Sequence, residues 1–376
     1  MVRTAPASGS ETLSLRRLNR ATLARQMLLA RERATPLKAV ERLVAMQAQW
    51  PRPPFVGLWS RLEGFARADL TKLLERRQVV RATFLRATLH LVTARDFLAL
   101  RPAVQPALAG AMQSIARARG ARLEVDGLLE RARRILASGP RTFEDLRDAF
   151  LRAEPGADER AMGYAVRMLL PLVQVPVGAE APWAFPAQAR FALADEWLGR
   201  PVPTEAAAPD ALVLRYLAAY GPASVADVQA WSGLRGLREA VERLRPRLRA
   251  FRDEGGRREL FDLPGAPRPD PDVPAPVRFV PEYDNLVAAR ADERVVARRH
   301  RPRVFLSALR IAATVLVDGF AAGTWKLERK KGTATVVVEP FAPFSPATRR
   351  AVAAEAEALA RFAEPDAGAY ELRVAK

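Results

Sequence analysis

A succession of short helices followed by a two-stranded hairpin is the feature that most constrains the fold, because it recurs along the chain. It is clearest in residues 209–263, where apolar residues at helical spacing predict three helices separated by short, glycine-containing breaks. Two short strands are expected next, on either side of Glu254, Gly255 and Gly256, a composition typical of a hairpin turn. Three helices followed by a hairpin are the parts of a winged helix.

Two earlier segments repeat this order. Residues 78–93, QVVRATFLRATLHLVT, are rich in valine and threonine and predict a hairpin after several short helices. A second hairpin is expected from residues 173–177 and 183–185. The proline-rich stretch 265–276 predicts a stiff linker. Beyond it, short strands between glycine-containing and charged turns predict a small β-barrel or a strongly bent sheet.

We therefore predict a mainly α fold with β wings, made of three tandem winged-helix units and a C-terminal β-barrel-like domain. A chain of this length can bury a separate core in each of several units. The expected parts are a disordered N-terminus over residues 1–12, winged-helix units over 13–123, 124–200 and 201–268, and the β-rich domain over 269–376.

The composition excludes several classes of site. The chain has no cysteine and only two histidines, His90 and His300, which leaves out disulfides, zinc fingers and thiol nucleophiles. No metal or other cofactor is expected. There is no apolar run long enough to span a bilayer and no apolar signal-peptide core at the N-terminus, so we expect a cytoplasmic protein, active as a monomer and without a membrane partner.

The charge favours a polyanionic partner. The formal net charge is +18, and arginine supplies all but six of the 60 basic residues. Genomic base bias explains the preference for arginine over lysine but not the excess of positive charge, so we expect nucleic acid as the partner. A basic surface that is merely solvated remains the alternative.

Candidate DNA contacts come from three places. Arg81 and Arg86 lie in the hairpin 78–93, where a wing can meet phosphate. His90 lies in the same hairpin, and a hydrogen-bonded structural role is its favoured alternative. Arg235 and Arg238 belong to the basic face of a predicted helix, and Lys330 and Lys331 belong to a basic turn near Trp325. Solvated charge is the competing interpretation of these last four.

The stretch Val44 to Phe65, VAMQAQWPRPPFVGLWSRLEGF, carries the candidate catalytic residues Gln47 and Gln49. In an extended backbone, side chains two residues apart point to the same side. The prolines that follow stiffen the turn, and apolar residues at helical spacing bury the next element. Two amides on one rigid turn can jointly hold one water molecule or one base edge, although a Gln-x-Gln triplet alone also recurs by chance.

Four segments together resemble the tandem winged-helix DNA glycosylases typified by AlkZ and YcaQ, over nearly the whole chain from about Leu13. They are RQMLLARE, LVAMQAQWPRPPFVGLWSRLEGF, VVRATFLRATLHLVTARDF and FVPEYDNLVAARADER. The resemblance implies three winged-helix units in a concave arc, a β-barrel after them, and double-stranded DNA in the arc. Members of this family excise bases alkylated at a ring nitrogen, and some open interstrand crosslinks.

Within the resemblance, Gln47-Ala48-Gln49 is similar to the Gln-aliphatic-Gln signature of the AlkZ branch, whereas the other branch has Gln-aliphatic-Asp. Ala87 departs from the family pattern, because members usually have glycine in the triplet that reads Arg86-Ala87-Thr88 here. This change can alter the bend of the hairpin.

These residues predict a monofunctional DNA glycosylase acting on cationic N7- or N3-alkylated purines. Such a base already carries positive charge, so it needs no protonation to leave. Gln47 and Gln49 do not titrate, and we expect them to position a water molecule by hydrogen bonding. Lysine-based lyase chemistry is disfavoured, because the few lysines lie far from Gln47 in the sequence. A non-catalytic winged-helix transcription regulator and a scaffold that does not touch DNA are the alternatives.

Overall fold

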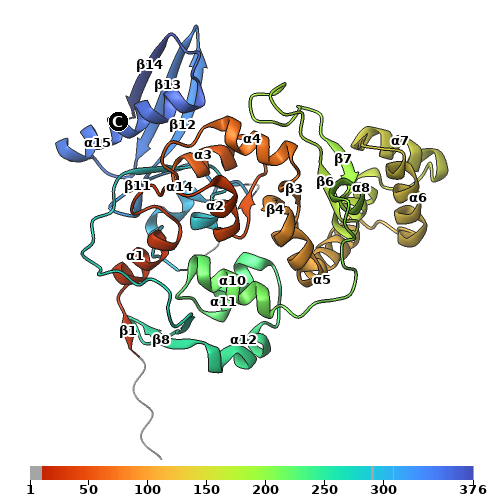
Figure 1. Ribbon diagram of the computed structural model, residues 1–376, viewed down its shortest axis with the longest axis horizontal. Helices are drawn as coiled ribbons and strands as arrows, with labels where there is room; N and C mark the ends of the chain where they lie inside the picture. Colours follow the sequence, from red (N-terminus) through yellow and green to blue (C-terminus); the bar gives the residue numbers. More distant parts are fainter. Residues whose placement is uncertain (1–10, 289–291, 308, 376) are drawn as a thin grey trace, which may run out of the picture.

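A computed structural model of the protein describes residues 11–288, 292–307 and 309–375. The first third of the chain forms short helices around strands, followed by one long helix (Figure 1). Pro36 opens the second helix, as the fixed φ of proline favours at a first helical position, and the cap Thr35 accepts from the Lys38 amide. The elements are α1 (Leu15–Arg25), α2 (Pro36–Arg42), β2 (Met46–Gln47), α3 (Arg52–Trp59), α4 (Arg67–Glu75), β3 (Val79–Thr83), the 3-10 turn η1 (Leu85–Ala87), β4 (Leu89–Thr93) and α5 (Ala94–Ala118).

The middle of the chain contains two further groups of three helices, each followed by a hairpin. The first group is α6 (Val125–Ala137), β5 (Arg141–Thr142), α7 (Phe143–Ala153), α8 (Glu159–Leu169), β6 (Leu172–Gln174), β7 (Arg190–Leu193) and α9 (Ala194–Leu198). The second is α10 (Asp210–Tyr220), α11 (Val225–Ser232), α12 (Arg238–Leu244), η2 (Arg245–Arg247), β8 (Arg249–Asp253) and β9 (Glu259–Asp262). Strand β1 (Thr12–Leu13) pairs in parallel with β8 and so joins the start of the chain to the second group.

The hairpins predicted at residues 78–93 and around Gly255 are present as β3–β4 and β8–β9. The hairpin between them differs from the prediction, because β6 pairs with β7 rather than with residues 183–185. The intervening loop contains Pro176, Pro182 and Pro186, which lack the amide hydrogen that a strand ladder needs.

One six-stranded sheet, in the order β2-β4-β3-β6-β7-β5, spans two of the predicted units. The bond between them is the antiparallel pair β3–β6, which sets Arg81 opposite Gln174 and Ala82 opposite Val173. Helix α5 packs against both α8 and η1. The hairpin 78–93 is therefore held between the helices of the first third of the chain and the group α6–α9.

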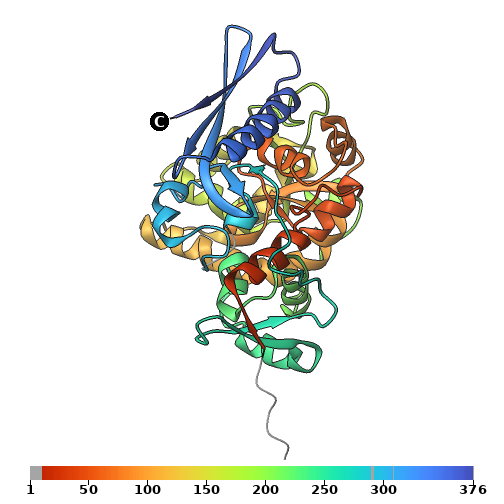
Figure 2. The ribbon, with the colours of Figure 1, turned by 90° about the vertical axis from the view of Figure 1, so that its left-hand side faces the viewer.

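The C-terminal part forms an open five-stranded sheet in the order β10-β11-β12-β13-β14. Within the described residues β10 and β14 are its two edges, so the sheet does not close into the small β-barrel that was one of the two expectations. The last strand pairs in parallel with β13, after α15 has crossed one face of the sheet (Figure 2). The elements are β10 (Arg278–Val280), α13 (Asn285–Ala288), η3 (Arg298–His300), α14 (Arg301–Val304), β11 (Thr314–Val317), β12 (Phe320–Lys330), β13 (Thr333–Pro340), α15 (Pro346–Ala363) and β14 (Ala369–Val374).

Buried ion pairs join segments that are far apart in the sequence. Arg61, just after α3, donates to both carboxylate oxygens of Asp284 over 2.8 Å, and both side chains are almost fully buried. Arg25 of α1 makes the same two-bond contact with Asp262 of β9 over 2.7 and 2.8 Å. Paired guanidinium and carboxylate planes fix orientation as well as distance, so the first pair sets how α3 meets the C-terminal part and the second sets how α1 meets β9.

Replacing Arg61 by methionine is expected to lower the free energy of unfolding by about 3 to 5 kcal/mol, because Asp284 would keep a buried charge without its cation. Urea titration followed by circular dichroism measures the change. The matched control is Arg33→Met, which removes an exposed ion pair with Glu63 and should leave the urea midpoint unchanged. Equal midpoints for Arg61→Met and wild type would contradict this prediction.

Candidate active site

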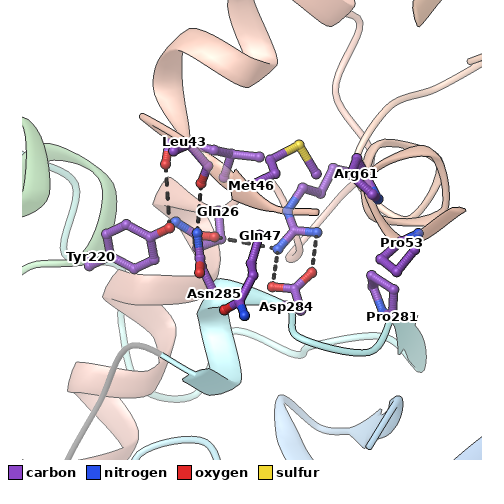
Figure 3. A pocket seen from close by; sticks show the side chains of 12 residues that line it. Gln26, Leu43, Met46, Gln47, Pro53, Arg61, Tyr220, Pro281, Asp284 and Asn285 are labelled. Atoms are coloured by element: carbon purple, nitrogen blue, oxygen red, sulfur yellow. Dashed lines mark hydrogen bonds and ion pairs between the residues drawn. The ribbon is translucent and has the colours of Figure 1, made fainter. Parts of the chain in front are cut away.

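Gln47 ends strand β2, which lies at the edge of the six-stranded sheet beside β4. Its register partner is His90 of β4, and its side chain is 8% exposed. The side chain enters a small pocket between the first helices, α10 and the segment before α13 (Figure 3). The free space in the pocket is about 10 Å³, which is about the least that can hold one water molecule. The pocket is lined by Gln26, Leu43, Ala45, Met46, Gln47, Pro53, Pro54, Arg61, Tyr220, Pro281, Asp284 and Asn285.

Gln49 lies where the chain leaves the interior. Ala48 is fully buried, and its amide donates to the Leu89 carbonyl over 2.7 Å, whereas Gln49 and Trp50 are exposed. The two glutamines thus stand on either side of a buried alanine, one beside the pocket and one at the surface. The turn that follows leads directly into α3, whose proline-rich start also lines the pocket.

Arg81 supports the backbone of this turn. Its Nε donates to the Ala48 carbonyl over 2.9 Å, and its Nη2 donates to the Gln49 carbonyl over 3.1 Å. The remaining Nη1 donates to Gln174 Oε1 over 2.5 Å. The residue is 6% exposed, and burial lowers the pKa of Arg81 to about 10. Its guanidinium is therefore occupied by protein acceptors that hold the Gln-Ala-Gln turn in place.

Arg86 reaches the Gln47 side chain from η1. Its Nη2 donates to Gln47 Oε1 over 2.8 Å and to Asn285 Oδ1 over 3.2 Å, and its Nη1 donates to the Trp231 carbonyl at the end of α11. Arg86 and Ala87 both have a left-handed backbone, with φ of 53° and 56°. Glycine adopts this conformation without strain, which gives a physical reason for the glycine that the resemblance implies where this chain has Ala87.

His90 lies inside the sheet. It is fully buried, its Nδ1 is 3.0 Å from the Thr88 carbonyl oxygen, and its Nε2 has no hydrogen-bond partner among the described residues. Burial lowers the pKa of His90 to about 3, and the positive charge of Arg86 adds to the shift. The ring is therefore neutral near pH 7.

The remaining predicted contacts lie at two ends of the molecule. Arg235 and Arg238 are exposed at the turn before α12 and on α12 itself. Arg235 lines a groove of about 630 Å³ together with Arg86 and with Arg117 of α5. Lys330 and Lys331 are exposed at the tip of the β12–β13 hairpin. That hairpin projects away from the body, on the side opposite α12 (Figures 1 and 2).

The described residues contain no group of three histidine, cysteine, aspartate or glutamate side chains that could hold a metal ion. Within the same ranges, no helix is both long and apolar enough to cross a membrane.

Sequence reasoning did not single out Asn285, Asp284 or Arg61 as pocket residues. All three are buried, and Asn285 Nδ2 donates to the Ala45 carbonyl over 2.7 Å, two residues before Gln47. The available signal was the polar run Tyr283-Asp284-Asn285 directly after an apolar strand, because such residues need buried partners.

The buried His90 predicts a specific loss of stability in acid. The unfolded chain protonates this histidine below about pH 6.5, whereas the folded protein does so only near pH 3. Its contribution to stability is thus complete above pH 6.5 and falls by about 2 to 3 kcal/mol by about pH 4.5. In urea titrations, wild type should lose more stability than His90→Gln between about pH 7.5 and 4.5; equal losses would show that His90 is not buried neutral.

Comparison with known proteins identifies the family of the chain. A family model described as DNA glycosylase AlkZ-like matches residues 40–362, which include the Gln-Ala-Gln turn and all residues that line the pocket except Gln26. The solved structure of Streptomyces sahachiroi DNA glycosylase AlkZ is similar with a TM-score of 0.77 and 23% sequence identity, over 97% of this chain and 100% of that one. At this identity the structural likeness concerns the fold. No curated protein matches the sequence. Because the family model covers most of its length, the chain belongs to the AlkZ-like DNA glycosylase family.

Proposed function

We propose that this protein is a monofunctional DNA glycosylase that releases cationic N7- or N3-alkylated purines, with Gln47 and Gln49 positioning the attacking water. The observation that carries the proposal is the buried amide of Gln47, held by Arg86 at a pocket of about the size of one water molecule. One lone pair of Gln47 Oε1 accepts from Arg86, which leaves the second lone pair and the two Nε2 hydrogens for water.

The chemistry of the substrate makes two neutral amides sufficient. An alkylated purine cation has a weakened glycosidic bond and leaves as a neutral base, so no acid is required. Water must then be held on the sugar face opposite the leaving base. Positioning of this kind contributes about 7 to 11 kcal/mol in the best oriented cases. A neutral base lacks this advantage and normally needs protonation to leave.

Asp284 is the alternative candidate for a general base, because its carboxylate lines the same pocket as Gln47. Both of its oxygens accept from Arg61, and Oδ1 also accepts from the Leu286 amide. These contacts support a structural role for Asp284 and favour the glutamines as the groups that hold water.

The DNA-binding surface that we propose is the groove formed by Arg86, Arg117 and Arg235, with Arg238 beside it. Arg117, Arg235 and Arg238 form no ion pair with the described residues, so their charge is available to phosphate. The three groups of helices with their hairpins would act as winged-helix units arranged around the duplex. Lys330 and Lys331 would meet the DNA only at a second and separate point.

Gln47→Ala and Gln49→Ala are each expected to reduce release of N7-methylguanine from duplex DNA by on the order of 100-fold, because a misplaced nucleophile costs about this much. Binding of the same DNA should be retained. Abasic sites cut by alkali measure the reaction, and an electrophoretic shift measures binding. The matched control is Gln78→Ala, which removes another exposed glutamine and should release base at the wild-type rate. Full excision by both Gln47→Ala and Gln49→Ala would refute the proposed mechanism.

Wild type should excise N7-methylguanine and leave uracil and mismatched bases in place, because those neutral bases need an acid that the pocket lacks. Single-turnover reactions on duplexes that differ only in the target base test this. Release of uracil at a comparable rate would exclude water positioning as the main source of catalysis. Tight binding to one undamaged sequence without any abasic product would instead identify a non-catalytic DNA-binding protein.

A further inference from the structure

We infer that Arg86 is a positioning residue that sets which way the Gln47 amide faces, with Asn285 and the Trp231 carbonyl holding Arg86 in turn. The inference rests on the proposed role of Gln47. It assigns to Arg86 an effect on the rate of base release that is exerted through Gln47, in addition to any attraction between its charge and DNA.

The direction of the Gln47 amide follows from hydrogen-bond chemistry. A guanidinium group only donates, so the Gln47 atom 2.8 Å from Arg86 Nη2 must be the oxygen. Turning the amide by 180° would set its NH2 group against a donor and lose the bond. Arg86 therefore selects one of the two amide orientations and directs Nε2 away from itself.

Arg86 has little freedom of its own. Its Nη1 donates to the Trp231 carbonyl, and its Nη2 is shared between Gln47 Oε1 and Asn285 Oδ1. Asn285 is oriented as well, because its Nδ2 donates to the carbonyl of Ala45, the residue just before strand β2. The result is a closed set of contacts between β2, η1, the end of α11 and the segment at Asn285.

The surroundings of Arg86 lower the stability of the folded protein. All three acceptors of Arg86 are uncharged, and no described carboxylate forms an ion pair with it. Part of Arg86 lines the groove, yet burial lowers the pKa of Arg86 to about 10. Its backbone is also left-handed. Arg86 is thus a desolvated cation that contacts neutral oxygens. Its backbone is strained, and it lies beside a candidate catalytic side chain. This combination is typical of a group kept for function.

Arg101 provides a matched comparison within the same chain. It is 2% exposed, and burial lowers its pKa to about 10 as well. It donates to the Met168 carbonyl and to Gln105, with no contact to the pocket of Gln47. Loss of the Arg101 guanidinium therefore reproduces the structural cost of removing a buried arginine without touching the Gln47 amide.

The test is a double-mutant cycle on single-turnover release of N7-methylguanine at saturating enzyme, using Arg86→Met, Gln47→Ala and their combination. Saturation separates the rate from DNA affinity. Arg86→Met should lower the rate by on the order of 100-fold in the wild-type background and have almost no effect in the Gln47→Ala background. Arg101→Met should release base at the wild-type rate. Arg86→Lys keeps a donor and the charge, so it should recover part of the rate. It replaces Arg86→Met in the test if that variant folds poorly.

Independent effects that multiply in the cycle would overturn the inference and leave the proposed function intact. A second measurement does not depend on activity. With 15N-labelled glutamine, the side-chain NH2 signals of Gln47, identified by their loss in Gln47→Ala, should move in Arg86→Met and stay in Arg101→Met. Unmoved signals would also overturn the inference. Absence of base release by wild type would refute the proposed function, while the spectra would still decide whether Arg86 orients Gln47.

Discussion

Buried arginines hold the parts of this protein in one geometry. Arg20, Arg25, Arg61 and Arg294 are among the largest fully buried side chains, and their guanidinium groups donate to carboxylates and backbone carbonyls on distant segments. Each presents five donors in a fixed plane and keeps its proton, so it needs several acceptors in a defined arrangement. The position of Gln47 depends on these contacts, because its pocket is formed by segments that they join.

This use of arginine changes the meaning of the basic composition. The formal charge of +18 suggests a broad surface for a polyanion, yet many arginines are internal and have acidic or carbonyl partners. The charge that phosphate can meet is concentrated in fewer residues, such as Arg117 and Arg235 beside the groove. Arg81, which the sequence also offered as a DNA contact, has all its guanidinium nitrogens on protein acceptors.

The proposed site is built from amides, so it depends on geometry rather than on pKa. A carboxylate or histidine can be tuned by its surroundings, whereas glutamine contributes only through which atom faces the water and from what distance. This accounts for the density of support around the turn: Arg81 holds the backbone on one side, and Arg86 with Asn285 holds the Gln47 side chain on the other. At Ala87 the hairpin turns through a left-handed backbone, a conformation that glycine adopts without strain.

Local signals in the sequence determined the helix starts at capping residues such as Thr35, the hairpin at residues 78–93 and the Gln-Ala-Gln turn. These follow from neighbouring residues, since capping, turn chemistry and alternation act within a few positions. Only the tertiary structure decided that β3 pairs with β6, that the C-terminal sheet stays open, and that Asn285 meets Arg86 beside Gln47. Each of these contacts joins residues about 90 or more positions apart or depends on a sheet edge, and no local pattern encodes which of many possible partners buries a given surface.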